Sequence, residues 1–234
     1  MKRLIAFALI LSLLLLLPAC AAANVNSTEG KDNVDRSKVW NEVTAALGYE
    51  PYRLQYCASE NGYHIVRWGG NTADMQTVTI AGYTFNTTSD TRLMAYKDGE
   101  FTDLVKAFFL GLVSRDGIAR AHEASEGKKT DAAPKVYDSA QAFFEDKKGP
   151  LEEFRILGEE NGCQIVYVAW KDGKGEARTV TVADIEFRFP EKEYIYIYRD
   201  GGSASLSWAF DQEIVSKETV TKVAQLYAEY ENKE

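Results

Sequence analysis

Two stretches of the chain, residues 96–108 (YKDGEFTDLVKAF) and residues 198–210 (YRDGGSASLSWAF), correspond at an offset of 102. The correspondence extends without a gap over residues 76–118 and 178–220, which share 13 identities in 43 positions. Upstream, Glu60-Asn61-Gly62 recurs as Glu160-Asn161-Gly162 at an offset of 100. A match of this length and order indicates an internal duplication, and this repeat decides the fold.

Each copy shows the same succession of patterns. A helical pattern comes first, and Asn-Gly between two apolar runs then predicts a β-hairpin, because both residues tolerate positive φ. Two further strands follow, rich in β-branched and aromatic residues. After Asp98-Gly99 and Asp200-Gly201 the apolar spacing becomes helical, and Ser114 and Ser216 are placed to cap a last helix. The predicted strands are 54–58, 63–68, 77–85 and 92–96 in the first copy, and 154–157, 164–170, 179–189 and 194–198 in the second.

These patterns predict an α+β protein made of two tandem repeats. Each repeat is expected to form a four-stranded antiparallel sheet with helices packed on one face, in the order α-β-β-β-β-α-α. The predicted organisation is a signal peptide (1–19), a lipidated N-terminus with a flexible tether (20–36), repeat domain 1 (37–126), a linker (127–135) and repeat domain 2 (136–234).

The N-terminus has the pattern of an export signal. Met1-Lys2-Arg3 is basic, and residues 4–17 are apolar except for Ser12, a run too short to span a bilayer. Leu17-Pro18-Ala19-Cys20 then resembles the lipobox of bacterial lipoproteins. The resemblance implies cleavage before Cys20, lipidation of its thiol and attachment to the outer face of the cell membrane. Ordinary signal cleavage within Ala21-Ala22-Ala23 is the alternative, and it would discard Cys20.

Composition and charge limit the classes of function. Among the 234 residues, 45% are hydrophobic and 26% charged, as in ordinary folded proteins. The net charge is −8, and about −10 once Lys2 and Arg3 are removed, which is the wrong sign for binding a phosphate backbone. Nucleic acid is therefore not expected as a partner.

Candidate catalytic and metal-binding residues are few. His64 and His122 correspond to Gln164 and Ala224 in the other copy, so the repeat supports neither, and the chain has no HExxH sequence and no cysteines at zinc-ligand spacing. The sequence thus predicts no catalytic residue, no metal and no cofactor. Cys57 and Cys163 are not equivalent in the repeat; they form either a disulfide between the copies or two buried thiols.

The segment from Tyr96 to Asp116 has the pattern Tyr-Lys-Asp-Gly, Leu, Ala-aromatic, Gly-Leu, Ser-Arg-Asp. It resembles a pattern of secreted proteins and lipoproteins of Gram-positive bacteria that have no assigned chemistry. In the second copy Glu213 replaces the glycine at position 111. The resemblance implies an extracytoplasmic location and provides no active site.

A row of tyrosines is the candidate partner surface. Tyr194, Tyr196 and Tyr198 share one face of a predicted strand, and Ile195 and Ile197 share the other. The isoleucines are expected in the core. The tyrosines then either cover the contact between the two copies or pack against neighbouring strands, or they form an exposed platform for an envelope protein or a glycan.

Taken together, the sequence predicts a membrane-tethered extracytoplasmic binding or adaptor lipoprotein without catalytic activity, attached to the bilayer through Cys20. Two alternatives stay open. The first is an inhibitor of a secreted hydrolase, by architectural analogy with tandem-repeat α+β inhibitors. The second is an enzyme of unrecognised type.

Overall fold

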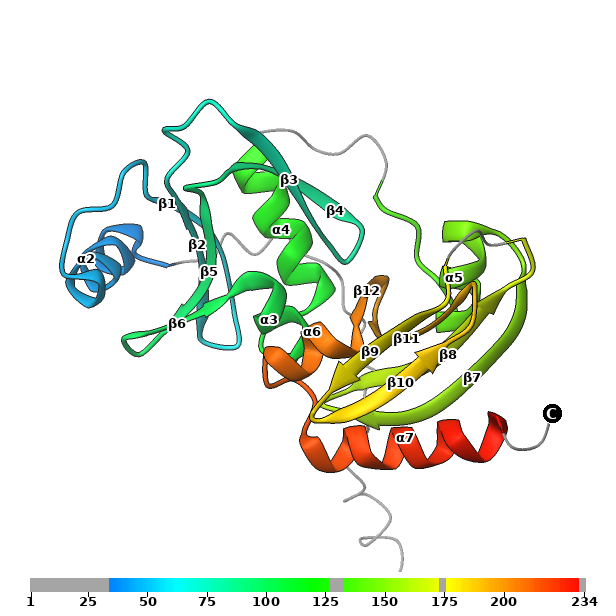
Figure 1. Cartoon of the computed structure of the whole chain (residues 1–234). Helices are drawn as coiled ribbons and strands as arrows, with labels where there is room; N and C mark the ends of the chain where they lie inside the picture. Colours follow the sequence, from blue (N-terminus) through cyan, green and yellow to red (C-terminus); the bar gives the residue numbers. More distant parts are fainter. Residues whose placement is uncertain (1–33, 127–132, 173–175, 232–234) are drawn as a thin grey trace, which may run out of the picture. The chain divides into compact units, whose positions relative to one another are not determined.

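The protein is α+β and consists of two tandem repeats, as a computed structural model shows (Figure 1). The structure describes residues 34–126, 133–172 and 176–231. The first repeat contains α2 (Arg36–Leu47), β1 (Gln55–Glu60), β2 (Tyr63–Trp68), β3 (Met75–Ile80), β4 (Tyr83–Thr88), β5 (Arg92–Lys97), β6 (Glu100–Asp103), α3 (Leu104–Phe109) and α4 (Arg115–Glu126). The second contains α5 (Ala140–Lys148), β7 (Leu151–Glu160), β8 (Cys163–Trp170), β9 (Arg178–Val182), β10 (Ile185–Phe189), β11 (Glu193–Arg199), β12 (Gly202–Ser205), α6 (Leu206–Asp211) and α7 (Lys217–Glu231).

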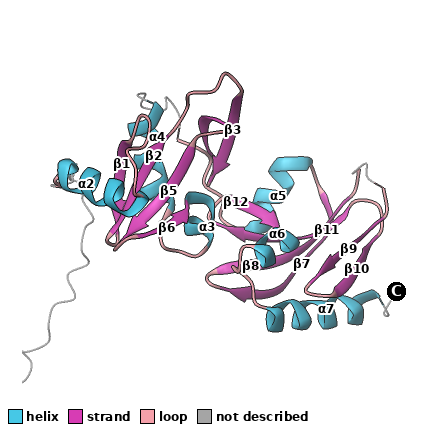
Figure 2. Cartoon of the chain, turned by 60° about the vertical axis from the view of Figure 1, so that its left-hand side comes forward, coloured by secondary structure: helices cyan, strands magenta, loops and turns pink. Residues whose placement is uncertain are grey.

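Each repeat has one four-stranded antiparallel sheet and a separate two-stranded hairpin (Figure 2). The sheets have the orders β1-β2-β5-β6 and β12-β11-β8-β7, and the hairpins are β3-β4 and β9-β10. Even an irregularity is repeated, because a β-bulge lies between Tyr56 and Ala58 in β1 and between Ile156 and Gly158 in β7. The duplication seen in the sequence is therefore also present in the structure.

The repeated Glu-Asn-Gly triplet has a structural explanation. Asn61 and Gly62 have φ of 52° and 79°, and Asn161 and Gly162 have 52° and 73°, as a type I′ turn requires. The preceding glutamate caps the last helix. The Glu60 carboxylate accepts hydrogen bonds from the backbone N–H and the hydroxyl of Ser114, at 2.8 and 2.6 Å. Glu160 accepts hydrogen bonds from the same two groups of Ser216, at 2.9 and 3.3 Å, both on its Oε2. One triplet therefore both reverses the chain and anchors the helix that ends the repeat.

The four sheet strands differ in part from those predicted. The predicted strand 77–85 is a hairpin, because Ala81 and Gly82 turn the chain with φ of 52° and 87°. Ala183 and Asp184 do the same inside the predicted strand 179–189. The fourth strand of each sheet is instead β6 or β12, a short strand that lies between the Asp-Gly turn and the helix that begins at Leu104 or Leu206.

Helices cover both faces of each sheet, where the prediction placed them on one. In the first repeat Ile65 belongs to the core beneath α3 and α4, whereas the next residue, Val66, packs in a second cluster with Val39 and Val43 of α2. In the second repeat Ile165 and Val166 are divided in the same way between α7 and α5. Consecutive apolar residues in β2 and β8 are the physical reason, because neighbours in a strand point to opposite faces.

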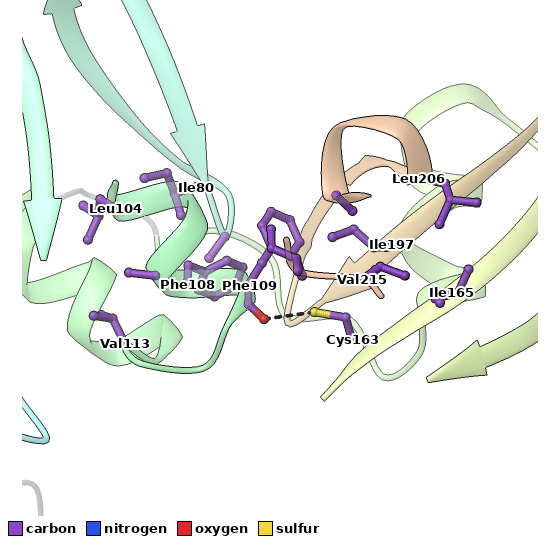
Figure 3. Close-up of a cluster of buried hydrophobic side chains, with 14 of the residues drawn as sticks. Ile80, Leu104, Phe108, Phe109, Val113, Cys163, Ile165, Ile197, Leu206 and Val215 are labelled. Atoms are coloured by element: carbon purple, nitrogen blue, oxygen red, sulfur yellow. Dashed lines mark hydrogen bonds between the residues drawn. The ribbon is translucent and has the colours of Figure 1, made fainter. Parts of the chain in front are cut away.

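The main hydrophobic core is continuous across the two repeats (Figure 3). Leu104 and Leu206 are both buried, as the duplication predicts, whereas Phe108 is fully buried and its counterpart Phe210 only half-buried. Figure 3 shows the Cys163 thiol directed at the backbone carbonyl of Phe109, to which it donates a hydrogen bond at 3.1 Å. The repeats therefore share one core.

Candidate binding groove between the repeats

A groove of about 690 Å³ lies where the two repeats meet. Its walls come from β3, the end of β6, α3, β12 and α6. The lining residues are Thr79, Ile80, Ala81, Asp103, Val105, Phe108, Phe109, Gly202, Ser203, Ala204, Ser205, Trp208 and Gln212. This volume is in the range of sites that bind small molecules.

One wall of the groove is aromatic. Phe109 and Trp208 contact each other edge to face, with ring centroids 5.7 Å apart. Their counterparts in the other repeat are Asp211 and Lys106, so the pair arises only because the copies diverged. Phe109 is buried and supports the ring of Trp208, whereas Trp208 is half-buried, which leaves part of its indole to contact a ligand.

Close packing between the repeats explains two glycines. A Cβ atom on Gly202 would lie 2.9 Å from the ring of Phe108, and one on Gly111 would lie 2.8 Å from the guanidinium of Arg199. The counterparts of these glycines, Glu100 and Glu213, carry long side chains and are exposed. The copies thus differ at the positions where they contact each other.

Two polar side chains of the groove cap its helices. Asp103 accepts hydrogen bonds from the backbone N–H groups of Val105 and Lys106 at 2.9 and 3.3 Å, and Ser205 accepts one from Trp208 at 3.2 Å. Asp103 is also the one charged residue among those that line the groove. The groove is therefore mostly uncharged. It combines an apolar wall with the polar backbone of two strands, and both can contact a ligand.

The tyrosine row is not an open surface. Tyr194, Tyr196 and Tyr198 lie on the face of β11 that α5 covers, and they pack with Phe143, Phe144 and Trp170. Tyr198 is 8% exposed, and the other two are half-buried. Burial raises the pKa of the Tyr196 and Tyr198 phenols. The row is therefore less exposed than a platform requires, because α5 packs on this face of the sheet. A role of these tyrosines in binding stays a prediction.

Both described cysteines are free and buried. Burial raises the pKa of the Cys57 thiol to about 12 and that of Cys163 to about 11. At neutral pH both are protonated and therefore poor nucleophiles. Of the two alternatives for this pair, the structure shows two buried thiols.

Both histidines have structural partners. His122 is buried against the rings of Tyr83 and Phe85, and its Nε2 lies 2.9 Å from the Thr84 carbonyl oxygen. The Nδ1 of His64 lies 2.5 Å from the Ser59 hydroxyl oxygen. Among the described residues, no group of three or more histidine, cysteine or acidic side chains is arranged to hold a metal ion.

The predicted lipidation site, Cys20, lies outside the described residues. Within residues 34–126, 133–172 and 176–231, no helix has the length and hydrophobicity needed to cross a membrane.

Sequence reasoning missed the groove, although a signal for it was present. The two copies match at Phe108 and Phe210 and then diverge at the next residue, where one has Phe109 and the other Asp211. At such positions one copy has an aromatic residue and the other has a charged residue, and in the structure the aromatic residues lie where the repeats contact each other. No protein-family model, no curated protein and no solved structure matches this chain.

Proposed function

We propose that this protein is a membrane-tethered, extracytoplasmic binding or adaptor lipoprotein that acts without catalysis and uses the groove between its repeats as the binding site. The groove carries the proposal, because it combines a volume of about 690 Å³ with the aromatic wall of Phe109 and Trp208. Aromatic side chains in a concave site provide a large contact area at low entropic cost. The sequence Leu17-Pro18-Ala19-Cys20 supports the tether.

The tether is tested by metabolic labelling in a Gram-positive bacterial host with a palmitate analogue. The wild-type chain is expected to carry label and to sediment with membranes, because two or more acyl chains give stable anchoring. The Cys20→Ala variant is expected to lose both properties. A wild-type protein whose mature N-terminus is Ala23 or Asn24, without lipid, would contradict the tether.

The binding site is tested by photo-crosslinking in the same cells. A benzophenone side chain introduced at Gln212, inside the groove, is expected to form a crosslink to an envelope component. The same group at Lys38, exposed on α2 and not among the groove residues, is the control. Equal crosslinking at both positions, or none at Gln212, would contradict a binding site in the groove.

A further inference from the structure

We infer that the groove binds an extended segment of another polypeptide, which adds a strand beside β12 and β3 and places an apolar side chain against Phe109 and Trp208. This inference rests on the proposed binding function and specifies the class of ligand. It follows from the way the backbone of two strands borders the groove.

The groove lies at two free strand edges. β12 is the last strand of its sheet and pairs only with β11, and β3 pairs only with β4. Residues of β12 and β3 line the groove, whereas none of the residues that line it comes from β11 or β4. The groove therefore borders two strands that each have one unpaired edge.

Strand register shows which backbone groups of these strands are not used in pairing within the sheet or hairpin. Arg199 and Gly202 flank the two-residue turn at Asp200-Gly201, so this pair exchanges hydrogen bonds, and the next pair, Tyr198 with Ser203, does not. The backbone N–H and C=O of Ser203 consequently point away from β11.

The same reasoning applies to β3. Ile80 and Tyr83 flank the turn at Ala81-Gly82, so the backbone of Thr79 points away from β4. The hydroxyl oxygens of Thr79 and Thr84 lie 3.0 Å apart, as expected for the closer side chains of a pair that does not exchange backbone hydrogen bonds. In the part of the chain that the structure describes, no residue bonds to the outward backbone groups of Thr79 or Ser203.

An extended polypeptide is the ligand that such edges bind best. Its backbone offers a donor and an acceptor at every second residue, which a strand edge can pair one after the other, while pockets beside the strand select its side chains. The Phe109 and Trp208 wall is that pocket here.

The groove also adjoins two smaller pockets. Ile80, Asp103 and Val105 are shared with a pocket of about 230 Å³ beneath the first hairpin, and Ser205 is shared with one of about 130 Å³ beneath the second. The lining residues of these two pockets correspond at the repeat offset, as Val78 does with Val180. Adjoining pockets of this kind offer places for further side chains of a bound chain.

The test uses linear dodecapeptides displayed on phage, selected on the chain that begins at Ala21. Selected peptides are expected to alternate β-branched or aromatic residues with polar ones, and a synthetic copy should bind in solution. Ser203→Pro removes the outward N–H without removing a bond to β11, and is expected to weaken binding by about tenfold, the effect of one lost hydrogen bond. Ser203→Ala keeps the N–H and should bind like the wild type.

A second measurement does not depend on the folding of a variant. Hydrogen exchange of the Ser203 and Thr79 amides in the wild type should slow when the peptide binds. Equal affinity of Ser203→Pro and wild type, or unchanged exchange at both amides, would overturn the inference. So would the absence of any enriched peptide, or occupation of this edge by a second copy of the chain. If the Gln212 crosslink leads to a glycan, the binding function stands and the peptide inference fails.

Discussion

Replacing Phe108 by alanine should lower the free energy of unfolding by about 3–5 kcal/mol, whereas the same change at Phe210 should cost no more than about half as much. Phe108 is fully buried and its ring reaches Gly202 of the second repeat, so its removal leaves a cavity at the centre of the shared core. Phe210 occupies the equivalent position but is half-buried. The pair is a matched control, because both changes remove the same atoms from the same helix position.

The measurement is urea unfolding of the chain from Ala21, followed by circular dichroism and by tryptophan fluorescence. Because one cluster of buried residues includes both repeats, we expect a single transition that both probes report alike. Phe108→Ala should shift this whole transition to lower urea. Two separate transitions, of which Phe108→Ala moves only one, would contradict a shared core. Equal losses at Phe108 and Phe210 would contradict the asymmetry.

Local signals in the sequence predicted much of the repeat. Asn61-Gly62 and Asn161-Gly162 predicted both hairpins, since few residue pairs accept positive φ at two successive positions. Helical spacing after the Asp-Gly turns predicted the helices that begin at Leu104 and Leu206. The class and the duplication were therefore accessible without a structure.

Features without a local signal were missed. The turn at Ala81-Gly82 places an alanine at positive φ, a conformation that alanine seldom adopts. The sequence therefore predicted one long strand, 77–85, in place of the hairpin. β6 and β12 are only four residues long, and the sequence of β12, Gly-Ser-Ala-Ser, has no hydrophobic alternation. The groove depends on contacts between the copies, which periodicity within one copy does not reveal.

The prediction that helices cover only one face of each sheet was also wrong, and this error bears on the tyrosines. Alternation in β11 correctly separated Ile195 and Ile197 from Tyr194, Tyr196 and Tyr198. It did not show that α5 covers the tyrosine face, because an aromatic face suits both an exposed platform and a second core. Phe143 and Phe144, adjacent on α5 and both buried, belong to that core.

Tyr196→Ala should accordingly destabilise the protein by about 2–4 kcal/mol, somewhat less than the loss of a fully buried aromatic ring. The Tyr196 ring contacts Phe144 and Trp170, with centroids 5.2 and 6.3 Å away, so truncation opens a void beneath α5. Tyr196→Phe keeps these contacts and should cost less than about 1 kcal/mol. Ile156→Ala, in the same sheet but 56% exposed, should be nearly neutral.

Urea unfolding of the three variants and peptide binding under native conditions separate the two roles of this tyrosine. A core residue lowers stability and leaves the affinity of the folded protein for its peptide unchanged. A platform residue would do the reverse, with weaker binding and nearly unchanged stability. Since α5 lies over this face and the free edges of β3 and β12 border the groove, we expect Tyr196→Ala to change stability and Ser203→Pro to change binding. If Tyr196→Ala instead weakened binding and Ser203→Pro left it unchanged, the tyrosine row and not the groove would be the partner surface.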